Sequence, residues 1–173
     1  MKKLHLLLIL SLIFVSCEGD RGPQGPPGEP AGAILGTIFE IEANFTAQND
    51  YNTLVEFPAN EIEVFESDIV QVYLLEEVVN DNSGPIDVWT PLPTSFFFND
   101  GSQLVYNYNY TFLDVNLFLG GNANFNTISD DRLINQIFRI AIIPADFAGE
   151  IKDISSYESV LQAIPNANIV KID

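Results

Sequence analysis

The sequence predicts a mainly β fold: an immunoglobulin-like or jelly-roll-like β-sandwich with one helix close to its C-terminal end. Two observations predict it. Between residues 33 and 173, β-branched and aromatic residues alternate with polar ones at a period of two. Clusters of Asn, Asp, Gly, Pro and Ser divide these runs into about seven to nine segments of strand length. The length of 173 residues fits one such domain with short accessory segments.

Four segments of the first half are predicted to be extended. Alternation predicts a half-buried strand over residues 39–45 and a second strand over residues 51–57. Residues 61–66 would form a short acidic edge strand, and residues 69–79 form a longer apolar run typical of an interior strand. Residues 86–98 contain the only tryptophan, and two prolines there mark an interruption or a sheet edge.

The second half begins with a hairpin signal. The Asp100-Gly101 pair predicts a tight turn, because glycine accepts the positive φ that such turns require. In the strand that follows, the alternation changes phase between Phe112 and Leu113, which predicts a β-bulge or a bend between two sheets. Residues 136–143 have the composition of another buried strand.

A single helix is predicted after residue 155. Ser155 and Glu158 have the spacing of a capping box, in which the two side chains satisfy free backbone amides at the start of a helix. Apolar residues follow at helical spacing as far as Ile164, and Pro165 ends the helix. Residues 169–172 would add a final strand or an extended tail.

Residues 1–16 have the features of a secretory signal peptide. Two lysines precede an apolar run that is shorter than the roughly 20 residues of a membrane-spanning helix. The run ends in the segment Phe-Val-Ser-Cys at residues 14–17, which resembles the lipobox of bacterial lipoproteins. This resemblance implies cleavage before Cys17, a diacylglyceryl thioether on its sulfur and an acylated amino terminus. Several acyl chains together give stable membrane anchoring.

Residues 17–32 are predicted to form a stalk with a collagen-like pattern. Four consecutive Gly-x-y triplets cover residues 19–30, and this period suits chains in the polyproline II conformation. Because four triplets are few for a triple helix, the pattern favours a monomeric spacer of about 35–40 Å. A trimer assembled through the stalk is the alternative.

The residue types of the mature chain restrict its chemistry. Cleavage before Cys17 removes the only histidine, and lipidation uses the only cysteine. The mature chain then has no imidazole or thiol for nucleophilic catalysis, zinc binding or haem ligation. We therefore expect no enzyme activity, no metal and no cofactor. The formal charge of −17 also argues against nucleic acid as a partner, since phosphate binding needs clustered Lys and Arg.

The candidate binding residues lie in one predicted strand and are Tyr106, Asn107, Tyr108, Asn109 and Tyr110. An exposed row of tyrosine rings beside amides would stack on sugar rings and hydrogen-bond to their hydroxyls. The strict alternation favours a second interpretation, in which the tyrosines form a core face and the amides lie in water.

Acidic residues suggest two further candidate sites, one for calcium and one for catalysis. Turns at residues 80–82, 99–100 and 130–131 offer oxygen ligands for calcium, but no segment has the spacing of a calcium-binding EF-hand loop. The acids between residues 61 and 77 could supply the carboxylate pair of a glycosidase. A solvated edge that resists strand-to-strand aggregation explains them better.

The whole chain resembles collagen-like lipoproteins of Gram-negative bacteria, with a lipobox, a short Gly-x-y stalk and a β-rich domain over residues 33–173. The resemblance implies a cell-envelope protein held on the outer membrane by its lipid. We expect the domain to be a non-enzymatic interaction or structural module for an extracellular protein or glycan. A glycan-binding module is the first alternative, and a carboxylate-dependent hydrolase is the second.

Overall fold

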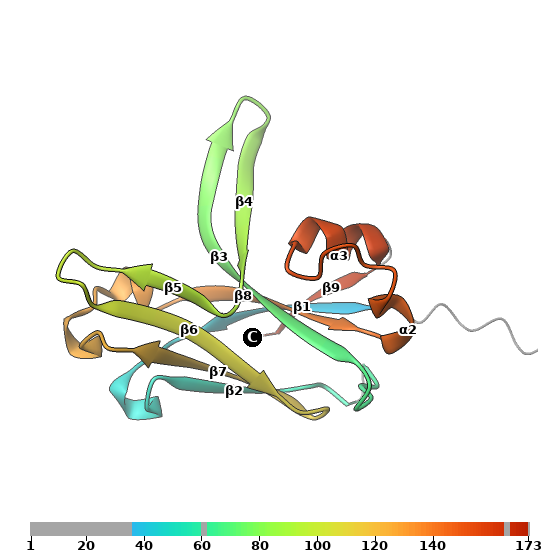
Figure 1. Cartoon of the computed structure of the whole chain (residues 1–173), viewed down its shortest axis with the longest axis horizontal. Helices are drawn as coiled ribbons and strands as arrows, with labels where there is room; N and C mark the ends of the chain where they lie inside the picture. The colour runs from blue at the N-terminus through green and yellow to red at the C-terminus, as the bar shows by residue number, and fades with distance from the viewer. Residues whose placement is uncertain (1–35, 60–61, 165–166, 173) are drawn as a thin grey trace, which may run out of the picture. The chain divides into compact units, whose positions relative to one another are not determined.

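The computed structural model describes residues 36–59, 62–164 and 167–172 (Figure 1). The predictions for the signal peptide, Cys17 and the stalk lie outside the described residues. Nine strands in the described residues form two sheets, so the predicted mainly β sandwich is confirmed. No helix among these residues has both the length and the apolar character needed to cross a membrane.

The larger sheet, sheet A, has the strand order β4-β3-β8-β1-β9. Its strands are β1 (Thr37–Ala43), β3 (Ile69–Asp81), β4 (Gly84–Pro91), β8 (Gln136–Ile143) and β9 (Asn168–Ile172). All neighbours in this sheet are antiparallel except β1 and β9, which run parallel. The chain therefore enters the domain through a strand that has neighbours on both sides.

The smaller sheet, sheet B, has the strand order β2-β7-β6-β5. Its strands are β2 (Asn52–Glu56), β5 (Thr94–Phe97), β6 (Gln103–Tyr110) and β7 (Asp114–Gly121). The predicted hairpin at Asp100-Gly101 joins β5 to β6 and is confirmed, with Gly101 at a φ of 83°. The proline-marked interruption is confirmed too, because the chain leaves sheet A after β4 and enters sheet B with β5.

The phase change at Phe112 and Leu113 has a different cause from the one predicted. Strands β6 and β7 are antiparallel neighbours in one sheet, and residues 111–113 form the turn between them. The Thr111 amide donates to the Asp114 carbonyl at 2.9 Å, and the Thr111 hydroxyl donates to the Asp114 carboxylate. The prediction of a bulge or of a bend between sheets is therefore wrong, since the alternation restarts where the chain reverses.

The main core lies between the two sheets and is built from alternate residues of their strands. In β1 and the residues after it, Phe39, Ile41, Ala43 and Phe45 are all buried, as the alternation predicted. The acidic edge strand predicted over residues 61–66 is wrong, because its described part, residues 62–66, has no strand structure. Two apolar side chains of this segment pack against the core instead of pairing with a sheet edge.

Strands β3 and β4 continue past the rest of sheet A as a projecting hairpin (Figure 1). Residues 70–74 of β3 are buried, but residues 76–81 are all exposed. The register shifts between Leu75 and Glu77, which is a β-bulge at the root of the projection. The prediction of an interior strand over residues 69–79 is thus confirmed only for its first half, because the second half has no other layer over it.

Two short helices cover the outer face of sheet A and form a second apolar cluster with it. They are α2 (Ala145–Ala148) and α3 (Tyr157–Ala163). The cluster includes Tyr73 from the sheet and Val160 from α3, both buried. The predicted C-terminal helix is confirmed, but its cap is Ser156, whose hydroxyl accepts from the Ser159 amide. Ser155 instead donates to the Asp153 carboxylate in the preceding turn.

Candidate functional site

The predicted ladder of β6 is divided between the two faces of sheet B. Tyr106 is buried at 1% exposure, and its hydroxyl donates to the Arg132 carbonyl. Tyr108 is half-buried and its hydroxyl donates to the Val70 carbonyl at 3.1 Å. The core interpretation is therefore confirmed at Tyr106. Alternation places the asparagines on the opposite face of the strand, so tyrosine rings and amides do not share one surface.

Tyr110, at the end of the ladder, lies beyond the core. Its exposed fraction is 44%, and its ring stacks on that of Tyr108 with centroids 6.2 Å apart. Here it joins three other exposed apolar side chains, and we call these four residues the end patch: Phe65, Tyr110, Phe112 and Leu113. Phe112 follows β6 in the turn, so the strand alternation alone could not reveal that it lines the same depression as Phe65.

Two depressions accompany the end patch. The larger has a volume of about 530 Å³ and an apolar lining that includes Phe57, Ile62 and Leu113. The smaller, of about 200 Å³, lies between Phe65, Tyr110 and Phe112 and also has the carboxylates of Glu66 and Asp68 in its lining. Val64 and Phe112 line both depressions, which makes them neighbours on one surface. The small depression has the size and the aromatic walls that suit a single ring of a ligand.

The second exposed apolar surface is on the projecting hairpin. Val78, Val79 and Ile86 are exposed by 43–49%. Val79 pairs directly with Ile86, so the two side chains lie on the same face of the hairpin. Together, the end patch and the hairpin hold seven of the ten exposed large hydrophobic residues in the described part of the chain. Exposure gathered in this way is typical of interaction sites, whereas scattered exposure has no such meaning.

Three carboxylates of the described residues are engaged in local turns. Asp81, Asp100 and Asp153 each accept hydrogen bonds from the amide and hydroxyl of a serine two residues later. These bonds, from the serine hydroxyl first, hold the pKa of all three carboxyls below the ordinary value. Such turns form for backbone reasons. Among the described residues, no three His, Cys, Asp or Glu side chains come together where a metal ion would bind.

Carboxylate pairs nevertheless lie in two depressions. Glu66 and Asp68 line the small depression of the end patch, where Asp68 accepts from the Phe65 amide at 3.0 Å. Glu76 and Asp131 line another depression of about 230 Å³ at the root of the hairpin. Glu76 there accepts from the Thr90 hydroxyl. In each pair one carboxylate is thus already engaged by a neighbouring donor.

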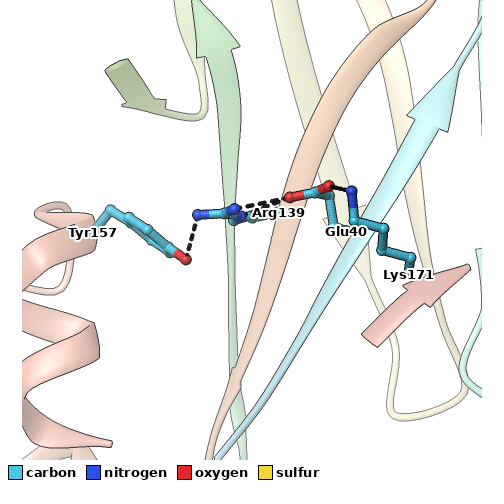
Figure 2. A network of polar contacts seen from close by, with 4 residues as sticks. All are labelled: Glu40, Arg139, Tyr157 and Lys171. Carbon is cyan, nitrogen blue, oxygen red and sulfur yellow. Dashed lines mark hydrogen bonds and ion pairs between the residues drawn. The ribbon is translucent and has the colours of Figure 1, made fainter. Parts of the chain in front are cut away.

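A cationic network connects the outer face of sheet A to α3 and β9 (Figure 2). The Nε and Nη2 of Arg139 donate to one oxygen of Glu40 at 3.0 and 2.8 Å, and Nη1 donates to the Tyr157 hydroxyl at 2.8 Å. Lys171 pairs with the other Glu40 oxygen at 2.7 Å. The Arg139 guanidinium also lies 4.0 Å from the ring centroid of Trp89. Because the guanidinium of Arg139, the Glu40 carboxylate and the Tyr157 hydroxyl all face partners within the fold, this network serves packing.

Comparison of the chain with protein-family models, with curated proteins and with solved structures finds no significant match.

Proposed function

We propose that this chain is a lipid-anchored protein of the bacterial cell envelope, which displays its β-sandwich as a non-enzymatic interaction module. Residues 1–17 support the anchor, since their pattern resembles a lipobox. The observation that carries the module is the gathering of exposed apolar side chains into the end patch and the hairpin. Leaving these side chains in contact with water costs free energy in the isolated chain, and this cost is removed when a partner covers them.

Two measurements test this proposal. Metabolic labelling with a palmitate analogue should mark the wild-type chain and leave Cys17→Ser unlabelled. A photoreactive residue placed at Phe112 or Ile86 should give discrete cross-links on cells, whereas one placed at Leu54, which is exposed on the outer face of β2, should not. An unlabelled wild-type chain would refute the anchor, and equal cross-linking from all three positions would refute the module.

Catalysis is the competing outcome. The purified chain should not turn over a broad panel of glycosides and esters. If turnover occurred and were abolished by Asp68→Asn or Glu76→Gln, one of the two carboxylate-lined depressions would be an active site, and the chain would be a hydrolase.

A glycan is the second candidate partner, and the small depression of the end patch favours it. Aromatic rings that stand around a space of about 200 Å³ offer a stacking surface, and Glu66 at its wall offers a hydrogen-bonding group. Binding on a glycan array should be lost in Tyr110→Ala. It should persist in Phe97→Ala, because Phe97 is an aromatic ring that is even more exposed (76%) but lies on β5, away from the end patch. Equal loss in both variants would refute a specific glycan site.

A further inference from the structure

The face of the hairpin that carries Val79 and Ile86 continues the core face of sheet A. In β4 the side chains of Ile86, Val88 and Thr90 alternate onto one face, and Thr90 is paired with Leu74, a core residue. Val79 is paired with Ile86 on this face. We call Val79, Ile86 and Val88 the hairpin strip. The strip is the part of the core-facing surface that extends beyond sheet B and so has no apolar layer against it.

A two-stranded ribbon gains little stability by itself in water. Beyond Leu75 the hairpin has lost its other neighbours, and both of its faces are open to solvent. Its turn is nevertheless well formed, with the Asp81 carboxylate accepting from the amide and hydroxyl of Ser83. A locally ordered ribbon that exposes Val79 and Ile86 on one face, next to the half-buried Val88, is suited to being covered from that side by another molecule.

The charges around the strip indicate what kind of molecule would cover it. Residues 75–91 contain four acidic residues and no basic one; they are Glu76, Glu77, Asp81 and Asp87. Glu77 is paired with Val88, which places its carboxylate beside the strip. A second copy of this acidic chain would bring like charges together. A partner with positive side chains next to apolar ones would satisfy both features of this surface.

The edge of β4 indicates how contact is made. β4 is the outermost strand of sheet A, but Pro85 and Pro91 lie at its two ends and donate no amide hydrogen. Prolines of this kind oppose the addition of another strand at the edge. Contact through side chains on a face of the hairpin is thus favoured over strand addition at its edge, and the strip is the face on which paired apolar side chains are exposed.

We infer that the hairpin strip is the docking surface for a polypeptide partner that presents alternating basic and apolar side chains. This inference rests on the proposed interaction module and names the chemistry of one partner. Apolar side chains of the partner would cover Val79 and Ile86, and its basic groups would lie against Glu77, which is on the same face.

The test uses the full chain and short synthetic peptides in which lysine alternates with valine. Binding is followed by the fluorescence of Trp89, the only tryptophan, which lies in β4 at the root of the hairpin. The lysine–valine peptide should bind, while peptides alternating lysine with serine, or glutamate with valine, should bind at least tenfold more weakly. Nuclear magnetic resonance shifts on binding should concentrate in residues 76–90.

Substitutions distinguish binding at the strip from non-specific electrostatic attraction of a basic peptide to an acidic protein. The double variant Val79→Thr with Ile86→Thr should weaken binding at least tenfold, which corresponds to about 1.4 kcal/mol. Leu54→Thr makes the same kind of change on an exposed residue of β2 and should leave the affinity unchanged. Glu77→Gln keeps the apolar strip and should reduce both the affinity and its dependence on salt.

Three outcomes would overturn the inference: equal affinity for the wild type and the double threonine variant, equal loss in Leu54→Thr, or self-association of the chain that the double variant abolishes. The last outcome would assign the strip to a second copy. None of these results would affect the palmitate labelling or the cross-linking from the end patch, so the proposed interaction module can stand if the docking surface fails.

Discussion

Replacement of Arg139 by alanine should destabilise the domain more than replacement of any other charged group in the described residues. Its side chain and that of Glu40 are only 15% and 14% exposed, so their contact is little screened by water. Loss of a hydrogen-bonded charge of this kind costs about 1.5–3 kcal/mol. Loss of the bond to Tyr157 and of the stacking on Trp89 adds about 1 kcal/mol or more.

Lys171 limits the effect. Its ammonium remains 2.7 Å from Glu40, so the carboxylate keeps one partner in the variant. We therefore expect Arg139→Ala to lower the free energy of unfolding by about 3 kcal/mol, below the 3–5 kcal/mol that follows when a buried charge loses its only partner. For a domain of this size such a change lowers the melting temperature by roughly 10 °C.

Urea unfolding followed by far-ultraviolet circular dichroism measures this change. Trp89 fluorescence is unsuitable here, because the substitution removes a group that lies against the indole. Arg139→Lys keeps the charge but loses the planar guanidinium, and its effect should be intermediate. Lys171→Ala is the control, since Lys171 is 76% exposed and surface pairs contribute less than about 1 kcal/mol. An Arg139→Ala variant within about 0.5 kcal/mol of wild type would refute a stabilising role for the network.

Three further predictions concern pH and packing. Hydrogen bonding from Lys171, and then from Arg139, holds the pKa of Glu40 below its ordinary value of 4.5. The stability that Glu40 contributes is therefore fully present above pH 4.5 and is lost as the pH falls through the lowered pKa. Urea unfolding of Glu40→Gln over the same pH range should lack this loss. Burial raises the pKa of Tyr106 to about 12. The stability that neutral Tyr106 gives the domain should therefore be present below pH 10 and be lost between pH 10 and 12. Melting curves of Tyr106→Phe over this alkaline range should lack that loss. In urea unfolding, Gly121→Ala should lower the free energy of unfolding by about 2 kcal/mol or more, because a Cβ at its φ of 104° would lie 2.2 Å from the Gln103 carbonyl oxygen. Gly149→Ala is the control and should be neutral, since a Cβ there meets nothing within 4 Å.

The sequence predicted best those parts of the fold that are decided by local alternation. The buried face of β1, the strand over residues 136–143 and the hairpin at Asp100-Gly101 all follow from residue spacing within one segment. The long strand β3 was predicted only in part. Its apolar composition continues to Val79, but burial depends on whether a second sheet lies opposite, and this is not a property of the segment itself.

The exposed apolar surfaces were harder to predict from the sequence than the strands, because they depend on tertiary structure. Alternation in β6 correctly divided tyrosines from asparagines, but it could not show that Tyr110 extends past the core to meet Phe65, which is distant in the chain. The phase change at Phe112 had two local explanations, and the turn that it marks requires knowledge of which strands pair. Likewise, the parallel pairing of β9 with β1 joins the two ends of the domain and has no local signal.

The position of β1 also determines how the domain carries mechanical force. A pull on the N-terminal side of the domain would enter at Thr37, the first residue of β1. This strand is paired with β8 over residues 37–43 and with β9 over residues 37–41. Such a load runs along the strand and across these bonds, so it is shared by many of them at once and does not open them one after another. A domain pulled by its N-terminal end would thus resist unravelling at the strand where the tension arrives.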